Sequence, residues 1–300
     1  MRARVLGSAA GGGFPQWNCG CDNCVLARAG DPRVAARTQD SIAISSKGDR
    51  WLLVNASPDV HRHIETFAGL HPWAARHTPI AAIALTNGDL DHVLGLLSLR
   101  ESQPLVLLST ARVRSGLVDR NAMLRTLARS ADQVSWSILK IGEETALDEV
   151  GVGVTAIASP GKLPVHLTGL LEPSAEDNVA LRIRDLSTSK TLVIATAVGS
   201  LAAVDELARG ADALMFDGTF WSEDELIALG LGQSRAGDMA HVPVGGAGGS
   251  LERLSALRAT RRIYTHINNT NPMLREDSPE RAAVERAGWE IAHDGLEVVL

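Results

Sequence analysis

The chain has 300 residues, 45% of them hydrophobic and 21% charged, with a formal net charge of −6 at pH 7. No apolar run is long enough to cross a bilayer, and no block of Lys and Arg suggests a large phosphate-binding surface. Residues 1–13 lack the apolar centre of a signal peptide. We therefore expect a cytoplasmic protein, one domain over residues 1–300, that binds neither membrane nor nucleic acid.

Strands are predicted first along the chain, and strands that alternate with helices follow. Ser41 to Ser45 alternates apolar and polar residues, and Trp51 to Val54 follows after a turn, which predicts a hairpin. The apolar run Ile80 to Leu85 predicts a buried strand, and Val93 to Arg100 a helix. Further strands are predicted at Leu105–Leu108, Val152–Ala158, Val179–Ile183, Leu192–Ala195, Ala213–Phe216, Arg262–Thr265 and Leu296–Val299, and further helices at Ala202–Ala208, Glu223–Leu229, Leu251–Arg258 and Pro279–Ala287. This order favours two sheets with helices outside, although the pattern alone does not exclude a doubly wound sheet.

All three cysteines of the chain, Cys19, Cys21 and Cys24, lie close together near the N-terminus. An odd and tightly clustered set makes a poor disulfide framework. Three neighbouring thiolates suit a soft ion such as Zn²⁺, which needs a fourth ligand from elsewhere in the chain. We therefore expect a structural zinc knuckle at residues 19–24 rather than three free thiols.

Potential metal ligands follow the buried strand that ends at Leu85. Asp89, Asp91 and His92 lie within four residues of one another. Two carboxylates so close repel each other unless a cation or a proton lies between them. Capping of a helix N-terminus explains one aspartate, but not two aspartates followed by a histidine. The segment therefore favours a metal site.

Other candidate site residues also follow predicted strands. His266 begins an amide-rich loop, which taken alone could equally serve to cap a helix. Asp217 could orient or charge His241, as acid–base pairs require, although each of these two residues is weak evidence alone. Two histidines and one carboxylate match the ligands of non-haem Fe(II) oxygenases, and hydrolytic zinc sites use similar ligands. Ligand type therefore leaves the metal open.

Over its whole length the sequence resembles the pyrroloquinoline quinone (PQQ) biosynthesis protein B family, a branch of the metallo-β-lactamase-fold superfamily. The segments that carry the resemblance are Gly7–Gly13 with the cysteine knuckle, Thr86–His92 with Gly95, Asp177–Leu181, Phe216–Trp221, Asp238–His241 and Thr265–Pro272. Together they are much more specific than any one of them alone. The resemblance implies a four-layer αββα sandwich.

The sequence departs from the superfamily at the first of its two usual metal sites. The hallmark of the superfamily is similar to Thr-His-x-His-x-Asp-His, and Asn87 and Asp89 replace its first two histidines here. A third histidine would fall at about Asp177, and the usual bridging aspartate near Ala197. The second site keeps Asp91, His92 and His266. The resemblance therefore implies one metal ion, with Asp89 as an extra or neighbouring ligand, and disfavours hydrolysis by two ions.

The resemblance also implies a function. The family looks like an iron-dependent hydroxylase that adds oxygen to the tyrosine ring of a Glu-Tyr unit from a small precursor peptide. This implies Fe²⁺ in the active site, with Zn²⁺ as an alternative in the purified protein, and O₂ and a tyrosine-containing dipeptide or peptide as partners. His241 and Asp217 would bind substrate or move protons, and Asn269 would be the fourth ligand of the zinc knuckle. A zinc hydrolase similar to phosphodiesterases and a carrier of the finished quinone are the alternatives, and the electron source and the oligomeric state, a homodimer included, stay open.

Overall fold

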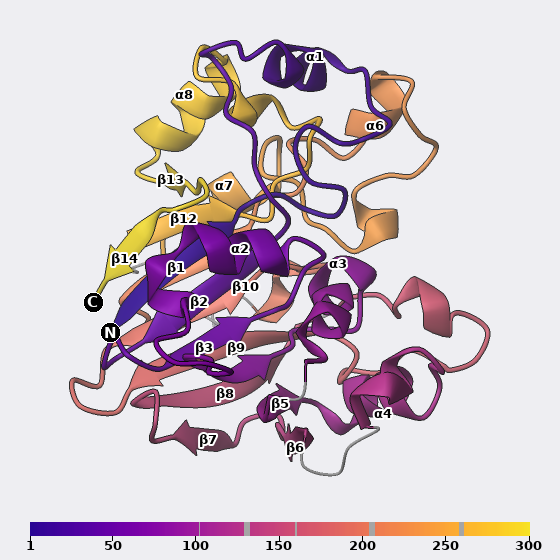
Figure 1. The fold of residues 1–300 in the computed structure, drawn as a ribbon. Coiled ribbons are helices and arrows are strands. Elements are labelled where there is room, and N and C mark those ends of the chain that lie inside the picture. The colour runs from indigo at the N-terminus through magenta and orange to yellow at the C-terminus, as the bar shows by residue number, and fades with distance from the viewer. Residues whose placement is uncertain (102, 129–132, 160, 204–207, 258–260) are drawn as a thin grey trace.

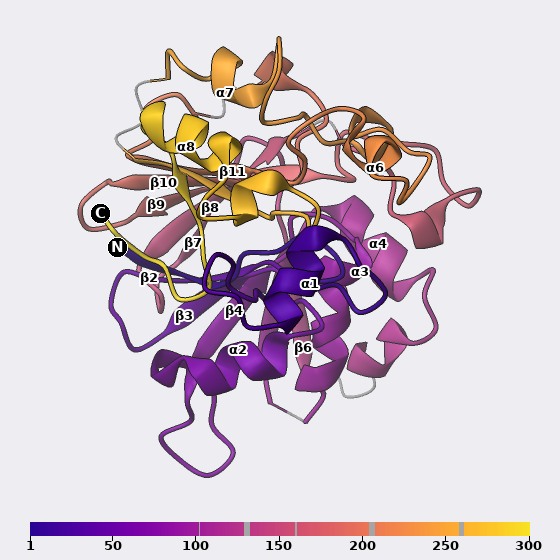
Figure 2. The ribbon, with the colours of Figure 1, turned by 90° about the horizontal axis from the view of Figure 1, so that it is seen from above.

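Two sheets packed face to face form the centre of the computed structural model, which describes residues 1–101, 103–128, 133–159, 161–203, 208–257 and 261–300. Each sheet has seven strands. Helices cover the two outer faces, so the layers follow one another as helix, sheet, sheet and helix (Figures 1 and 2). The predicted αββα sandwich is confirmed, and the doubly wound alternative is excluded.

In the first sheet, β4 is an interior strand with a parallel neighbour on each side. Its order is β14 (Glu297–Val299), β1 (Arg2–Gly7), β2 (Ser41–Ser45), β3 (Trp51–Val54), β4 (Ile80–Ala84), β5 (Leu105–Ser109) and β6 (Val134–Ile138). β2 and β3 form the predicted antiparallel hairpin, whereas β3 to β6 are parallel. The carboxyl ends of these parallel strands therefore meet at one edge.

The second sheet also contains parallel strands whose carboxyl ends meet at one edge. Its order is β13 (Glu290–Ile291), β12 (Arg261–Thr265), β11 (Ala213–Asp217), β10 (Thr191–Ala195), β9 (Val179–Asp185), β8 (Val152–Ala158) and β7 (Glu144–Leu147). β10, β11 and β12 are parallel, and Asp217 lies opposite Thr265 in the register. The polar segments after β11 and β12 are therefore neighbours.

Apolar residues fill the space between the sheets and the space under the helices. Ile42 and Leu52 from the first sheet and Val154 and Ile194 from the second belong to one cluster and have no exposed surface. Full burial of such a side chain contributes about 1.5–3 kcal/mol. The cluster holds the two sheets, and thus their polar edges, in a fixed relation.

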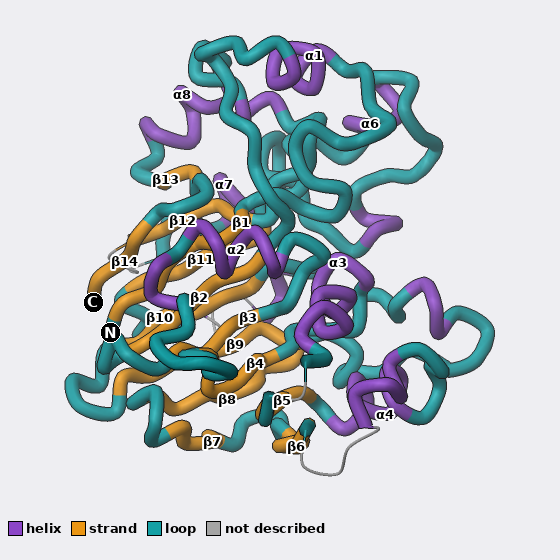
Figure 3. The backbone as a smooth tube through the Cα atoms, viewed as in Figure 1, coloured by secondary structure: helices purple, strands orange, loops and turns teal. Residues whose placement is uncertain are grey.

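Short helices complete the outer layers, and loops connect most of them (Figure 3). The α-helices are α1 (Asp22–Arg28), α2 (Val60–Thr66), α3 (Leu90–Val93), α4 (Ala111–Val118), α6 (Glu225–Ala228), α7 (Ser250–Arg253) and α8 (Pro279–Arg286). The 3₁₀ turns are η1 (Ala68–Leu70), η2 (Leu94–Leu99), η3 (Leu124–Ala128), η4 (Val165–Leu167), η5 (Leu201–Ala203), η6 (Gly237–Met239) and η7 (Pro272–Leu274). Within the described ranges no helix has the length and apolar character needed to cross a membrane.

The helix predicted at Val93 to Arg100 was wrong in its start and its type. The α-helix α3 begins at Leu90, and the chain continues as the 3₁₀ turn η2. The chain is confined at Gly95, whose backbone nitrogen donates to the carbonyl of Ala56 at 2.9 Å. Two other predicted helices reach outside the described residues: Ala202–Ala208 over residues 204–207, and Leu251–Arg258 at its last residue.

Gly95 offers a test of this packing. A Cβ atom there would lie 2.1 Å from the carbonyl oxygen of Ser57 and 2.7 Å from that of Ala56. We expect Gly95→Ala to lower the free energy of unfolding by about 1–3 kcal/mol, because the backbone must shift to relieve the overlap. Urea denaturation measures the change. Gly232→Ala is the control, since its Cβ would meet only Leu226, at an ordinary 3.5 Å, and an equal loss in both variants would contradict the interpretation.

Candidate metal centre

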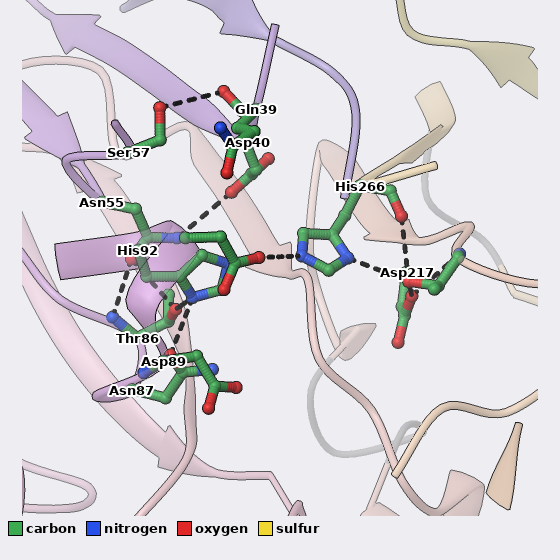
Figure 4. Close-up of polar contacts among 12 residues, drawn as sticks. Gln39, Asp40, Asn55, Ser57, Thr86, Asn87, Asp89, His92, Asp217 and His266 are labelled. Carbon is green, nitrogen blue, oxygen red and sulfur yellow. Dashed lines mark hydrogen bonds and ion pairs between the residues drawn. The ribbon is translucent and has the colours of Figure 1, made fainter. Parts of the chain in front are cut away.

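Segments far apart in the sequence end at the same edge of the sandwich. β4 leads into α3, which carries Asp91 and His92, while β11 ends at Asp217 and β12 ends just before His266. Figure 4 shows His266 between Asp217 on one side and the residues around His92 on the other. The fold thus brings together four of the residues that the sequence predicted for the site.

Asp91, His92 and His266 form a group with the geometry of a metal site. Their donor atoms all lie within 4.8 Å of one another. The Oδ2 atom of Asp91 is 3.5 Å from Nε2 of His266 and 3.8 Å from Nε2 of His92. Both Nε2 atoms are buried without a hydrogen-bond partner among the described residues. Since buried polar atoms are rarely left unsatisfied, the three side chains fit one divalent ion.

Hydrogen bonds on the outer side of each imidazole direct its Nε2 atom toward the centre. Nδ1 of His92 lies 2.8 Å from Oδ1 of Asn87 and 3.2 Å from the hydroxyl of Thr86. Nδ1 of His266 lies 2.8 Å from Oγ1 of Thr219. Because Nδ1 donates in both rings, Nε2 keeps the lone pair that a metal requires.

Thr219 connects His266 to the predicted acid–base pair. Its hydroxyl donates to Oδ1 of Asp217 at 2.6 Å while Oγ1 accepts from His266. Oδ2 of Asp217 accepts from Nδ1 of His241 at 2.7 Å and from the backbone nitrogen of Val198 at 2.9 Å. Asp217 and His241 are thus paired, as the sequence suggested. Sequence reasoning missed Thr219, although its place two residues after a strand-end aspartate was the available signal.

Charges around the centre favour a cation. Burial works against the charged forms, but His92 and His266 hold the pKa of Asp91 well below its usual range. Burial likewise opposes protonation of His266, yet the nearby carboxylates of Asp91, Asp40 and Asp217 raise the pKa of His266 to about 9. The same carboxylates favour a positive charge at the centre, whether a proton on His266 or a metal ion carries it.

An amide network occupies the place of the first metal site of the superfamily. Asn87 donates to Oδ1 of Asn178 at 3.1 Å, and Asn178 in turn donates to the carbonyl of Ala197 at 2.6 Å. Asp177 forms an ion pair with Arg112 at 2.9 Å. Asn87 and Asn178 are engaged in hydrogen bonds and Asp177 in an ion pair, which disfavours a second ion at these positions.

The candidate metal centre lies beside a cavity of about 340 Å³, which His92, His241 and His266 line. Asp89 lies in the wall of this cavity as well. Within the part of the chain that the structure describes, it is not among the groups of three side chains that could hold a metal. Burial and the neighbouring charge of Asp91 raise the pKa of Asp89. Its role as a metal ligand stays a prediction.

The cysteine knuckle forms a second, separate cluster. The three Sγ atoms lie within 4.8 Å of one another, and Nδ2 of Asn269 lies 3.1 Å from Cys19, 3.6 Å from Cys21 and 3.4 Å from Cys24. Burial raises the pKa of Cys21 to about 12, so ionisation of all three thiols requires a cation. Asn269 is at the predicted position, but its amide nitrogen rather than its oxygen faces the sulfurs, so its role as a zinc ligand stays a prediction.

Comparison with known proteins gives matches over the whole chain. Residues 50–267 match the family described as a beta-lactamase superfamily domain. Coenzyme PQQ synthesis protein B from Methylorubrum populi is 45% identical over 305 residues, and the protein of that name from Methylobacterium nodulans is 46% identical over 307, with 100% of both chains covered in each case. The crystal structure of Zn²⁺-bound PqqB from Methylobacterium extorquens matches with a TM-score of 0.92, 43% identity and 100% of both chains. A diphosphatase of the PhnP family has a TM-score of 0.69 at 21% identity over 99% of this chain and 97% of its own, which shows a shared fold alone.

Thr219 provides a first test of the centre. Thr219→Val keeps the shape of the side chain but leaves Nδ1 of His266 without an acceptor, so we expect zinc affinity to fall about 10–100-fold. Competition with a chromophoric chelator measures the change. Thr219→Ser retains the hydroxyl and should bind zinc nearly as the unchanged protein does. Equal affinity in the Val and Ser variants would show that the hydroxyl does not orient the histidine.

Zinc affinity should also depend on pH in a defined direction. His266 must lose its proton before Nε2 can bind a metal, and its pKa is raised from 6.5 to about 9. Affinity should therefore rise about tenfold per pH unit as the pH approaches 9 from below and level off above it. The same raised pKa stabilises the metal-free fold at low pH, and that contribution is lost as pH rises through about 9. An affinity that does not change with pH, after correction for the chelator, would contradict this assignment.

Proposed function

The chain belongs to the coenzyme PQQ synthesis protein B family of the β-lactamase superfamily, and on this premise we propose that it acts in PQQ biosynthesis as an Fe(II)-dependent hydroxylase. Its substrate would be the tyrosine ring of a precursor derived from Glu-Tyr. The observation that carries the proposal is the group of Asp91, His92 and His266, one carboxylate and two imidazoles whose Nε2 atoms are buried without hydrogen-bond partners among the described residues. This is the ligand set of non-haem iron oxygenases.

The amide network argues against hydrolysis by two metal ions. That mechanism needs one ion to polarise the bond and another to share the attacking and leaving oxygens. Asn87, Asn178 and Asp177 are engaged in hydrogen bonds and an ion pair, so they do not supply a second site. The Zn²⁺ of the Methylobacterium extorquens relative is compatible with the same three ligands, and Zn²⁺ is expected in this protein as purified.

The residues of the chain would have separate tasks in hydroxylation. Asp91, His92 and His266 would hold Fe(II), whose chemistry when bound is the activation of O₂. His241 lies in the cavity wall, and because Asp217 binds its Nδ1 atom, Nε2 remains to accept the phenol proton or return it. Phe220 adds an apolar surface to the cavity and reduces its exposure to water.

The overall reaction requires an electron donor as well as O₂. Hydroxylation replaces one aromatic C–H bond by C–OH with one oxygen atom. The second oxygen atom leaves as water and takes two protons and two electrons from an external reductant. The two-electron reductant is therefore a co-substrate that any assay must contain.

The test is to load the purified protein with Fe(II) or Zn²⁺ without air, add Glu-Tyr and ascorbate, and then admit air. We expect products heavier by one oxygen atom with Fe(II) only, measured by mass spectrometry. His92→Ala and His266→Ala should abolish both product and iron occupancy, whereas His71→Ala, at an exposed histidine outside the cavity, should change neither. Turnover with Zn²⁺ before air is admitted would refute the proposal.

A further inference from the structure

A second cavity, with a volume of about 220 Å³, adjoins the cavity beside the metal centre. Phe220, Met239 and Asn268 border both cavities. Met239 and Asn268 are only half-buried, so a ligand can pass over them from one cavity into the other. Pockets for small molecules typically have about 300–1,000 Å³. The cavity at the metal centre, with about 340 Å³, lies at the lower end of that range, so the two cavities together suit a ligand larger than one amino acid.

Asn268 lies where the two cavities adjoin, and its amide has a defined orientation. Nδ2 donates to Oγ1 of Thr270 at 2.5 Å, and this hydroxyl donates to Oε1 of the buried Glu225. Oε2 of Glu225 accepts from the backbone nitrogen of Trp221 at 2.6 Å. Because Nδ2 is directed toward Thr270, Oδ1 remains as an acceptor that has no hydrogen-bond partner among the described residues. An N–H group of a ligand would satisfy it.

The wall of the second cavity combines apolar and amide side chains. Leu226 and Leu231 provide apolar surface, and Gln16 and Asn18 provide amide groups. Nε2 of Gln16 donates to Oδ1 of Asn18 at 2.8 Å, which leaves Nδ2 of Asn18 available as a donor. Such a wall suits a short aliphatic chain that ends in an acceptor, since amide N–H groups bind both carboxylates and carbonyl oxygens.

We propose that the second cavity binds the residue joined to the nitrogen of the substrate tyrosine, and that Oδ1 of Asn268 accepts a hydrogen bond from the peptide N–H between them. The proposal rests on the proposed function, since it takes the tyrosine ring to lie at the metal centre. The phenol would then lie beside His241, and the backbone nitrogen, at the opposite end of the tyrosine, would reach Asn268. A glutamyl side chain would pack its methylene groups on Leu226 and Leu231 and present its carboxylate to Asn18.

The test measures binding, so that it does not depend on the hydroxylation chemistry. The Zn²⁺-loaded protein, kept without air, is titrated with Glu-Tyr and with N-acetyl-L-tyrosine, which keeps the amide N–H but has no side chain for the second cavity. Ligand-observed NMR gives each affinity. We expect Glu-Tyr to bind roughly tenfold more tightly, because it buries more apolar surface and adds a hydrogen bond to a charged group. Equal affinities would overturn the proposal.

Variants of the wall locate this difference in the second cavity. Leu231→Trp should fill part of the cavity, and Asn18→Ala should remove its available donor; both side chains are exposed, so the fold should tolerate the changes. Each variant should weaken Glu-Tyr about 3–10-fold and leave N-acetyl-L-tyrosine unchanged. Leu229→Trp is the matched control, at an exposed leucine that lines neither cavity, and should alter neither affinity. A loss for both ligands or for neither in Leu231→Trp would place the acyl residue elsewhere.

Asn268 is tested with a ligand that lacks the donor. In O-acetyl-4-hydroxyphenyllactate, an ester oxygen replaces the N–H group of N-acetyl-L-tyrosine. Asn268→Ala should weaken N-acetyl-L-tyrosine about 3–10-fold and leave both the affinity for the ester and the affinity for zinc unchanged. An equal effect on the two ligands, or a loss of zinc, would overturn this role of Asn268. Absence of hydroxylation with Fe(II), by contrast, would refute the proposed chemistry and leave the binding of Glu-Tyr in the second cavity intact.

Discussion

Two buried imidazole nitrogens that face one carboxylate are the constraint on which the rest of the site depends. Nε2 of His92 and of His266 have no partner among the described residues, and burial of such atoms is costly unless an ion or a proton satisfies them. The two rings come from different sheets, so the packing of the sandwich brings them together. Binding of a metal therefore stabilises the contact between the sheets as well as completing the centre.

The sequence predicted the residues of the candidate metal centre better than the groups that orient them. Asp91, His92 and His266 were found because each is a metal-binding residue type after a predicted strand. Thr219 and the amide of Asn87 were not assigned to the histidines, because threonine and asparagine are common in loops and their partners lie elsewhere in space. The local sequence pattern reveals the residue type and the end of the strand. The hydrogen-bond partner of each histidine Nδ1 atom instead depends on how the strands and loops are placed beside one another.

The fold shows the same division between local and long-range information. The hairpin of β2 and β3 and the apolar strand β4 could be predicted, since alternation and an uninterrupted apolar run are local signals. β6 and β7 were missed, because they lie at the sheet edges and most of their residues are only partly buried or exposed. The 3₁₀ turn η2 was missed as well, because its cause is the close approach of Gly95 to another segment.

The departure from the superfamily pattern at two positions changes what surrounds the candidate metal centre. Asn87 and Asp89 stand where the superfamily pattern has histidines. Asn87 accepts from Nδ1 of His92 and thereby orients an imidazole of the candidate metal centre. Asp89 lies in the cavity wall, where burial and the charge of Asp91 raise its pKa. Hydrolysis by two metal ions uses the second ion to polarise the substrate. Because Asn87 is engaged with His92 and Asn178, the exchange of two histidines for an amide and a carboxylate counts against the first of the two usual metal sites rather than against the candidate centre at Asp91, His92 and His266.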